Sequence, residues 1–283
     1  MIDEYRFLDS RAVHVPRPWG ELRAFISTAA YTLKIVYRYP TNIAWMVVLP
    51  IAYIFMGTVM TRFVDWTDLA QLTGRQVDYL QFILSGMAMW LFSNASLGLA
   101  SSVEAEIMSG TAQTAFATPT RGATFLLGLM AAGFVPSLGI AALVAVFLGV
   151  THKGAALGRA LPSFIVALAV YVGIGLMMSA ASLRYRRIGR LASLLPFFEQ
   201  FFSGIFLPVN AIPIWLRALS FLSPTTWAID IVRSSLLRLN PLLPYAIEWP
   251  LLVALAAVSL CAGSWAVRRA MKRVAELGIG EMY

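Results

Sequence analysis

Long apolar runs alternate with short polar segments along the whole 283-residue chain. A transmembrane helix needs roughly 20 apolar residues, because each residue adds about 1.5 Å and the hydrocarbon core is about 30 Å thick. Runs of this size with little or no charge predict an all-α integral membrane protein with six transmembrane helices. They cover residues 43–61, 79–100, 123–150, 161–183, 191–208 and 249–267.

A further helical pattern precedes the first run. Pro18 opens this pattern and Pro40 ends it, since proline fits the first turn of a helix but cannot continue one. Such an amphipathic helix is typical of a segment that lies in the membrane interface, and the alternative is a helix packed on a soluble partner. Its apolar face consists of Trp19, Leu22, Phe25, Ile26, Ala29, Leu33 and Val36.

The composition, with 59% hydrophobic and 13% charged residues, excludes an ordinary soluble domain. Basic residues collect on the cytoplasmic side of membrane proteins, and cytoplasmic termini place about twice as many of them inside as outside. This predicts a multi-pass protein of the cytoplasmic membrane with a cytoplasmic segment and interfacial helix (1–42), a six-span domain (43–267) and a basic cytoplasmic tail (268–283). The net charge of +8 then reflects topology and attraction to anionic membrane lipids, so nucleic-acid binding is not expected.

A polar segment, residues 101–122, separates the second and third runs. Its first half fits a short helix that carries Glu104 and Glu106, and Gly110 suits the left-handed residue that commonly ends a helix. A second short helix is expected before Pro119, because the residue preceding a proline is biased away from helical angles. Small polar residues on such a helical turn suit docking into a groove of another protein, although an ordinary polar loop has the same composition.

Residues 203–237 stay apolar after the fifth run ends at Pro208. Pro213 begins one short helix and Pro224 begins another, with a serine in the capping position before Pro224. Both helices are too short to cross a bilayer. The segment therefore predicts a re-entrant or interfacial helical hairpin on the outer side.

Three charged residues lie in or beside these apolar segments. Glu199 falls within the fifth run, where a carboxyl group is costly and normally faces a partner or a watery path. It is therefore either part of a substrate route or gate, or a hydrogen-bonded structural acid. Asp230 and Arg233 are spaced i, i+3 and are expected to form a local ion pair in the hairpin. The aromatic residues around the acid, which fit the same route, are Phe197, Phe198, Phe201 and Phe202.

Two sets of residues resemble motifs of the membrane subunits of type-2 ATP-binding-cassette (ABC) exporters. The polar segment resembles the family's pattern of Glu, Gly-Thr and Thr-Pro at Glu106, Gly110, Thr111, Thr118 and Pro119. The hairpin resembles its pattern SGxFxPxxxxPxWL followed by Pro-Thr, Asp and Arg, at Ser203, Gly204, Phe206, Pro208, Pro213, Trp215, Leu216, Pro224, Thr225, Asp230 and Arg233. The resemblance covers nearly the whole chain, which is most similar to permeases of daunorubicin-type drug or lipid exporters.

The resemblance implies a permease that has no catalytic, cofactor or metal site of its own. ATP and Mg would bind to separate ATPase subunits, two per complex, and this chain indeed has no G-x-x-x-x-G-K-[ST] phosphate loop. In the family, the interfacial helix and the first cytoplasmic loop contact the ATPase, and two permease chains enclose the route, so a homodimer is expected. The implied ATPase-coupling residues are Glu104, Glu106, Gly110, Thr111, Thr118 and Pro119.

The sequence is compatible with two classes of substrate. Abundant Ala, Leu, Val and Met in the long runs favour an amphiphilic drug-like, lipid or glycolipid substrate. The cluster of phenylalanines would equally suit a polysaccharide or lipid-linked glycan.

A membrane-embedded enzyme would need clustered polar groups at one interface, and a passive channel would not explain the Gly-Thr and Thr-Pro loop. His14 and His152 are expected on opposite sides of the membrane, so they cannot share a metal ion.

Overall fold

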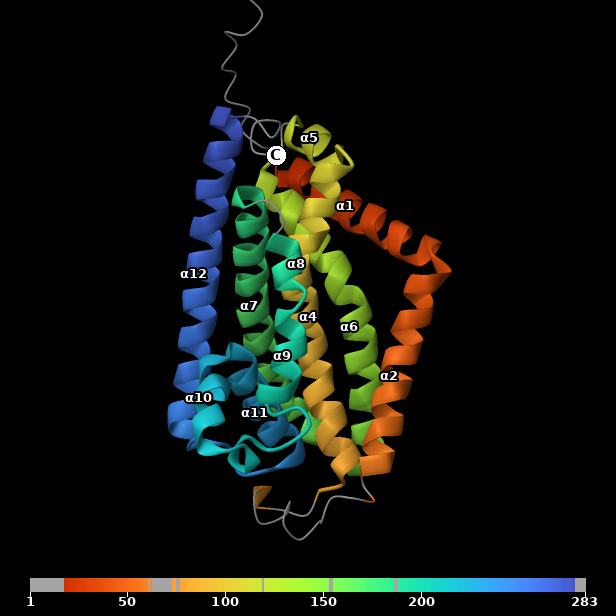
Figure 1. The fold of residues 1–283 in the computed structure, drawn as a ribbon, viewed down its shortest axis with the longest axis vertical. Coiled ribbons are helices and arrows are strands. Elements are labelled where there is room, and N and C mark those ends of the chain that lie inside the picture. Colours follow the sequence, from red (N-terminus) through yellow and green to blue (C-terminus); the bar gives the residue numbers. More distant parts are fainter. Residues whose placement is uncertain are drawn as a thin grey trace, which may run out of the picture.

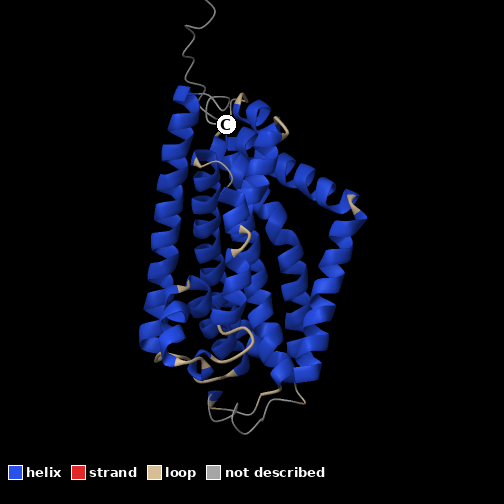
Figure 2. Ribbon diagram, in the orientation of Figure 1, coloured by secondary structure: helices blue, strands red, loops and turns tan. Residues whose placement is uncertain are grey.

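The computed structural model describes residues 18–60, 62, 73–74, 77–118, 120–152, 155–185 and 188–277. Within these ranges the chain forms helices and turns and no strand (Figure 2). Pro119 and the terminal segments 1–17 and 278–283 lie outside the described residues. In chain order, the elements are α1 (Pro18–Arg38), α2 (Pro40–Met60), α4 (Tyr79–Met108), α5 (Thr111–Phe116), α6 (Gly122–His152), α7 (Ala155–Arg184), α8 (Ile188–Ala192), α9 (Leu195–Phe202), the 3₁₀ turn η2 (Val209–Ala211), α10 (Ile214–Leu222), α11 (Pro224–Leu237) and α12 (Tyr245–Leu277).

The long helices lie side by side in a bundle with two distinct ends (Figure 1). The short helix α5 lies at one end, here the α5 end, and α10 and α11 lie at the other, here the α10 end. Helix α4 packs against α2, α6, α7 and α11. It does so because apolar residues occur around its whole circumference, so it has no face suited to water. Ile83, Met87 and Phe92 of this helix are fully buried.

Two glycines bring α7 and α12 into close contact. A Cβ atom at Gly173 would lie 2.3 Å from the carbonyl carbon of Ser259, and one at Gly263 would lie 2.5 Å from the carbonyl oxygen of Gly173. Small residues at such crossings let the two helix backbones approach closely. The hydrophobic effect does not drive helices together within a lipid bilayer, so these packing contacts stabilise the pair instead. The α7–α12 pair is therefore fixed along one side of the bundle.

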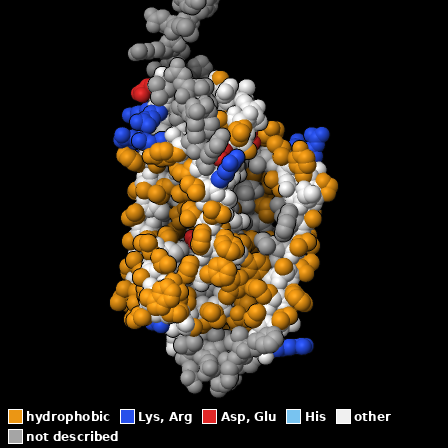
Figure 3. All heavy atoms as spheres, in the orientation of Figure 1, with side chains coloured by type: hydrophobic (Ala, Val, Ile, Leu, Met, Phe, Trp, Pro, Cys, Tyr) orange, Lys and Arg blue, Asp and Glu red, His pale blue; other side chains and the backbone are white. Residues whose placement is uncertain are grey.

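Four helical segments are long and apolar enough to cross a membrane: Tyr79–Met108, Gly122–Val150, Leu157–Arg184 and Tyr245–Glu276. They correspond to the second, third, fourth and sixth predicted spans. The first predicted span coincides with α2, whose 21 residues run beside α4. Apolar side chains cover the middle of the face shown in Figure 3, and Lys and Arg side chains lie towards its two ends. This distribution matches a protein embedded in a bilayer.

The fifth predicted span, residues 191–208, is not one continuous helix. It is divided into α8 and α9 by a turn at residues 193–194. Pro196 lies in the first turn of α9 and has no N–H to donate to the carbonyl of Ala192, so the helical ladder of α8 cannot continue. After α9, Gly204 adopts a φ of 80°, a conformation that favours glycine, and the chain turns away.

Helix α1 confirms the helix predicted between Pro18 and Pro40. It runs across the α5 end and meets the start of α2 at an angle (Figure 1). Its inner side packs on α6, where a Cβ atom at Gly128 would lie 2.7 Å from Thr28 Cβ. On its outer side Trp19 is 76% exposed. A transverse helix with one packed face and exposed aromatic residues has the geometry of an interfacial helix.

Candidate functional site

The α5 end carries the turn predicted from the Glu, Gly-Thr and Thr-Pro pattern. Helix α4 continues through this region without a break to Met108, so the first predicted short helix is its last two turns. Gly110 follows with a φ of 78°, as expected for a left-handed residue that ends a helix, and α5 begins at Thr111. The hydroxyls of Ser109 and Thr111 lie 2.9 Å apart across the turn.

The outer surface of this turn is small and polar. Ala112 is buried against the bundle, whereas Gln113 and Thr114 are exposed. The hydroxyl of Thr118 donates a 2.6 Å hydrogen bond to the carbonyl oxygen of Ala115, which closes α5, and it lies 2.7 Å from the Thr120 hydroxyl. Short side chains satisfied by their own backbone leave a compact surface with little bulk.

The two predicted coupling glutamates have different surroundings. Glu104 Oε1 accepts a 2.7 Å hydrogen bond from the backbone N–H of Gly189, and the Ser101 hydroxyl donates a 3.0 Å bond to the Gly189 carbonyl oxygen. Gly189 has no side chain to obstruct this contact, since a Cβ atom there would lie 2.8 Å from Ser101 Cα. Glu104 therefore ties α4 to α8. Glu106 differs, because its Oε2 atom is buried without a hydrogen-bond partner among the described residues.

A third glutamate, which the sequence analysis did not select, joins α1 to α6. Glu21 Oε1 accepts a 3.0 Å hydrogen bond from the backbone N–H of Arg121, and its Oε2 accepts one from the Thr124 hydroxyl. A carboxylate at this position satisfies a free N–H group and complements the positive end of the α6 dipole. The sequence of α1 does not indicate this role, because acidic residues are common in the first turn of a helix.

Glu199 lies at the junction of three elements in the bundle. Its carboxylate accepts hydrogen bonds from the Ser93 hydroxyl of α4 and from the Thr225 hydroxyl of α11, the latter at 3.0 Å. The Ser223 hydroxyl lies 3.5 Å from the same carboxylate, and Thr225 Oγ1 lies 3.1 Å from Ser93 Oγ. A cluster of three hydroxyl groups is therefore the hydrogen-bond partner of this acid. Such hydrogen bonds offset the cost of placing a carboxyl group among apolar side chains.

The phenylalanines around Glu199 point away from this cluster. Phe197, Phe198 and Phe201 are all more than half exposed, and Phe202 is half-buried. The rings of Phe197 and Phe201 pack edge to face with centroids 5.3 Å apart. Within this single chain they form an outward-facing aromatic surface on α9 rather than a closed ring.

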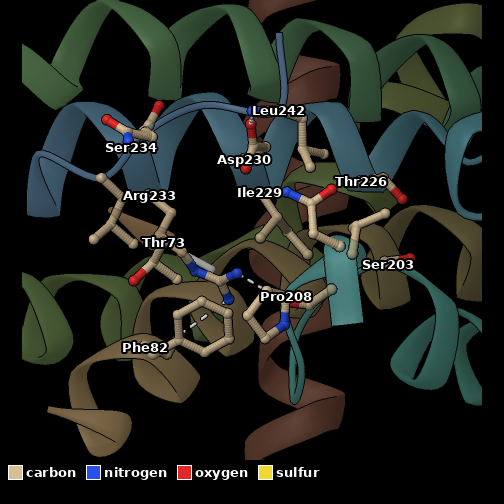
Figure 4. Close-up of a pocket in the computed structure, with 15 residues that line it drawn as sticks. Thr73, Phe82, Ser203, Pro208, Thr226, Ile229, Asp230, Arg233, Ser234 and Leu242 are labelled. Atoms are coloured by element: carbon tan, nitrogen blue, oxygen red, sulfur yellow. Dashed lines mark hydrogen bonds between the residues drawn. The ribbon is translucent and has the colours of Figure 1, made fainter. Parts of the chain in front are cut away.

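The predicted ion pair between Asp230 and Arg233 is wrong. Arg233 is buried and donates to the carbonyl oxygens of Gly204, at 2.7 Å, and Phe82, at 3.0 Å, while its guanidinium carbon lies 3.6 Å from the Phe82 ring centroid. Figure 4 shows the Arg233 side chain directed towards Phe82 and the Asp230 carboxylate directed towards Leu242. Asp230 accepts a 2.7 Å hydrogen bond from the Leu242 N–H.

The reason for this arrangement is that carbonyl groups at a chain reversal need donors. The turn at Gly204 leaves backbone carbonyls outside any helical ladder, and the planar guanidinium supplies several N–H groups in one fork. Gly86 makes room for it, because a Cβ atom there would lie 2.2 Å from Arg233 Nη2. A small cavity of about 30 Å³ beside these residues has the size of one water molecule.

The remaining hairpin residues lie at the ends of its helices. Pro208 precedes η2, Pro213 precedes α10 and Pro224 begins α11, so prolines mark each start as expected. Trp215 in α10 is 73% exposed. The two short helices have nearly the predicted limits and lie at the α10 end, opposite α5 (Figure 1).

Comparison with protein-family models identifies the family of this chain. The family model described as ABC-2 type transporter matches residues 23–237, a range that includes most of α1, the turn at Gly110, Glu199 and both helices of the hairpin. No curated protein matches the chain.

Proposed function

This chain belongs to the ABC-2 type transporter family, and we propose that it is the membrane-spanning subunit of an ATP-driven exporter. Members of the family are membrane permeases that work with ABC ATPase subunits, so this chain is a transport subunit. In the proposed complex, a second copy of this chain and two ATPase subunits complete the machine. ATP and Mg bind to the ATPase subunits, and this chain provides the route.

The observation that carries the proposal is the construction of the α5 end. A compact polar turn at Gly110 is rigidly continuous with the central helix α4 and is braced from two sides. Glu104 connects it to α8, and Glu21 connects the start of α6 to α1. A force applied to α5 by closure of an ATPase would therefore reach α1, α4, α6 and α8 together.

The proposed orientation places the α5 end in the cytoplasm. Helix α1 then lies in the inner interface, and α10 and α11 form a re-entrant hairpin at the outer side. Helix α2 spans about 31 Å at the standard helical rise, and α8 with α9 completes a sixth crossing. Both termini would accordingly lie on the cytoplasmic side.

The substrate that this geometry favours is an amphiphile with an apolar tail. An apolar cavity of about 240 Å³ lies between α4, α6, α7 and α11 and includes Leu138, Leu161 and Phe164 in its lining. Leu138 and Leu161 are also exposed on the outside of the bundle, so the cavity borders the lipid. A drug-like, lipid or glycolipid substrate could place its tail there, since apolar pockets select by shape and lack of polarity.

A second candidate substrate is a glycan chain, and one observation favours it. The exposed rings of Phe197, Phe198 and Phe201 on α9 offer flat surfaces of the kind on which sugars stack. In a pair of permease chains these surfaces would face the shared route if α9 lies at the interface.

The test is reconstitution of the chain with its ATPase into vesicles that contain ATP on the ATPase side. Export of a fluorescent lipid or amphiphilic drug, dependent on ATP, supports the proposal and its preferred substrate. Export of an oligosaccharide alone supports the second candidate. ATP hydrolysis without movement of either class, in a complex that is correctly assembled, contradicts the proposed exporter function.

A further inference from the structure

A groove between α7 and α12 at the α5 end has a charged mouth and an apolar floor. It has a volume of about 410 Å³, and it includes none of the residues assigned above to coupling, route or hairpin. Three arginines line the groove, Arg184 from the end of α7 and Arg269 and Arg273 from α12. Figure 3 shows Lys and Arg side chains gathered over this end of α12.

The charge of these arginines is not balanced within the described part of the chain. None of the three donates a hydrogen bond to, or forms an ion pair with, another described residue, although Glu276 lies only one turn beyond Arg273. Two guanidinium groups are instead held against aromatic rings, Arg184 at 5.3 Å from the Tyr185 centroid and Arg269 at 5.5 Å from the Trp265 centroid. Stacking orients a guanidinium and leaves its N–H groups available to an anion.

The floor of the groove continues towards the middle of the bundle. Met177 lies seven residues before Arg184, which is about 10 Å closer to the membrane centre at the helical rise. Between them, Ala180, Ala181 and Ala266 carry almost no side-chain bulk. Trp265 is 63% exposed at the level where the groove changes from apolar to charged, a position typical of tryptophan at a membrane–water boundary.

We propose that this groove binds one anionic glycerophospholipid, with its phosphate between Arg184, Arg269 and Arg273 and an acyl chain along the alanines. A free phosphate ion would use only the charged mouth, and a soluble protein segment would leave the membrane-level floor unfilled. An anionic lipid matches both halves at once. Basic groups near a membrane surface attract anionic lipids, and a fork of guanidinium donors adds hydrogen bonds to the phosphate oxygens.

The structure also indicates what such a lipid would hold. The crossing at Gly173 and Gly263 fixes α7 and α12 below the groove, and the lipid would join their ends above it. Met271 of α12, two residues from Arg269, packs against the start of α6, where its Sδ lies 2.2 Å from the position of a Cβ atom at Gly122. The proposed lipid would therefore contact α12 within two residues of the side chain that packs against the start of α6.

The experiment uses the full chain purified in mild detergent and titrated with palmitoyl-oleoyl phosphatidylglycerol or phosphatidylcholine, with bound lipid counted by native mass spectrometry. We expect Arg184→Gln with Arg269→Gln to weaken phosphatidylglycerol binding at least about tenfold, because charge-assisted hydrogen bonds are lost. Arg268→Gln with Lys272→Gln removes the same charge from the same end of the bundle, outside the groove, and should change binding less than about threefold. Phosphatidylcholine should bind the unchanged chain more weakly than phosphatidylglycerol.

A third variant tests the floor without altering charge. Ala181→Phe should fill the apolar part of the groove and weaken phosphatidylglycerol binding while all three arginines remain. This variant also tests the proposal if the Arg184→Gln, Arg269→Gln double variant fails to fold. Equal weakening by the two double variants would show general electrostatic attraction and overturn the proposal. So would unchanged binding in Ala181→Phe, or displacement of the lipid by millimolar inorganic phosphate, which would identify a site for free anions.

Discussion

Glu104 Oε1 accepts a 2.7 Å hydrogen bond from the N–H of Gly189, so the end of the central helix α4 is fastened to α8 across 85 residues of sequence. The contact depends on both residues, because the carboxylate supplies the acceptor and the glycine leaves room for it. It places the proposed coupling turn and the divided fifth segment in one mechanical unit. A carboxylate that was expected to face an ATPase is thus used within the chain.

Glu104→Ala should loosen this unit. A hydrogen bond to a charged acceptor contributes about 1.5–3 kcal/mol, so we expect the melting temperature of the purified chain to fall by a few degrees. Glu104→Gln keeps an acceptor oxygen and should lose less. Glu276→Ala, which removes an exposed carboxylate near the end of α12, is the matched control. If both alanine variants melt at the same temperature as the unchanged chain, the Glu104 contact does not stabilise the fold.

Gly110→Val should uncouple ATP hydrolysis from transport. A β-branched residue at a φ of 78° is strained by about 1–2 kcal/mol, so the turn between α4 and α5 would change shape. Gly110→Asn should be milder, because asparagine tolerates the left-handed region. The measurement is transport per ATP hydrolysed in the reconstituted complex. Gly98→Ala, in α4 with nothing within 4 Å of a new Cβ atom, should leave this ratio unchanged; normal coupling in Gly110→Val would remove the turn from the mechanism.

Two variants distinguish a structural role of Glu199 from a role in transport. Glu199→Leu leaves the Ser93 and Thr225 hydroxyls without their acceptor and should destabilise the chain by about 1–3 kcal/mol. Glu199→Gln retains one acceptor oxygen, so the complex should assemble and hydrolyse ATP at its basal rate while transport changes. Thermal melting measures the first and vesicle transport the second. Unaltered transport in a stable Glu199→Gln complex would assign Glu199 to structure alone.

Gly86→Ala should disturb the Arg233 cluster. The new methyl group would overlap Arg233 Nη2, and forcing extra volume into a packed site typically costs about 1–3 kcal/mol. Gly139→Ala, in open space on α6, should instead be neutral or slightly stabilising. Denaturation of the two variants in the same detergent compares them directly. Equal stability would mean that Arg233 can move without loss, contrary to the role assigned to its hydrogen bonds with Gly204 and Phe82.

The chain purified without partners should hydrolyse no ATP above background. The physical reason is that it has no glycine-rich loop and lysine to cradle the phosphates. Phosphate release measured before and after further purification separates intrinsic activity from contaminating ATPases. Turnover that persists at constant specific activity would require a nucleotide site of a different kind in this chain.

The sequence by itself determined the helical class and most of the element boundaries. Apolar runs of bilayer length have few alternatives to a helix, because backbone groups in lipid must be satisfied internally. Local signals also predicted helix boundaries, as at Pro18, Gly110 and Pro224. Proline and glycine act within a few residues, because they restrict or extend the backbone angles that the chain can adopt there. The family resemblance rested on the same local motifs, and the family match over residues 23–237 confirms it.

Only the tertiary structure decided which polar groups meet. The i, i+3 spacing of Asp230 and Arg233 suggested a local pair, but the guanidinium binds the carbonyls of Phe82 and Gly204, and Asp230 accepts from the Leu242 N–H instead. The Gly204 carbonyl lies at a chain reversal, where a buried acceptor outside a helical ladder needs a donor. Glu21 likewise bonds to Arg121, 100 residues away. Such contacts join helices through packing, and helical periodicity specifies which face is apolar without specifying which neighbour that face will meet.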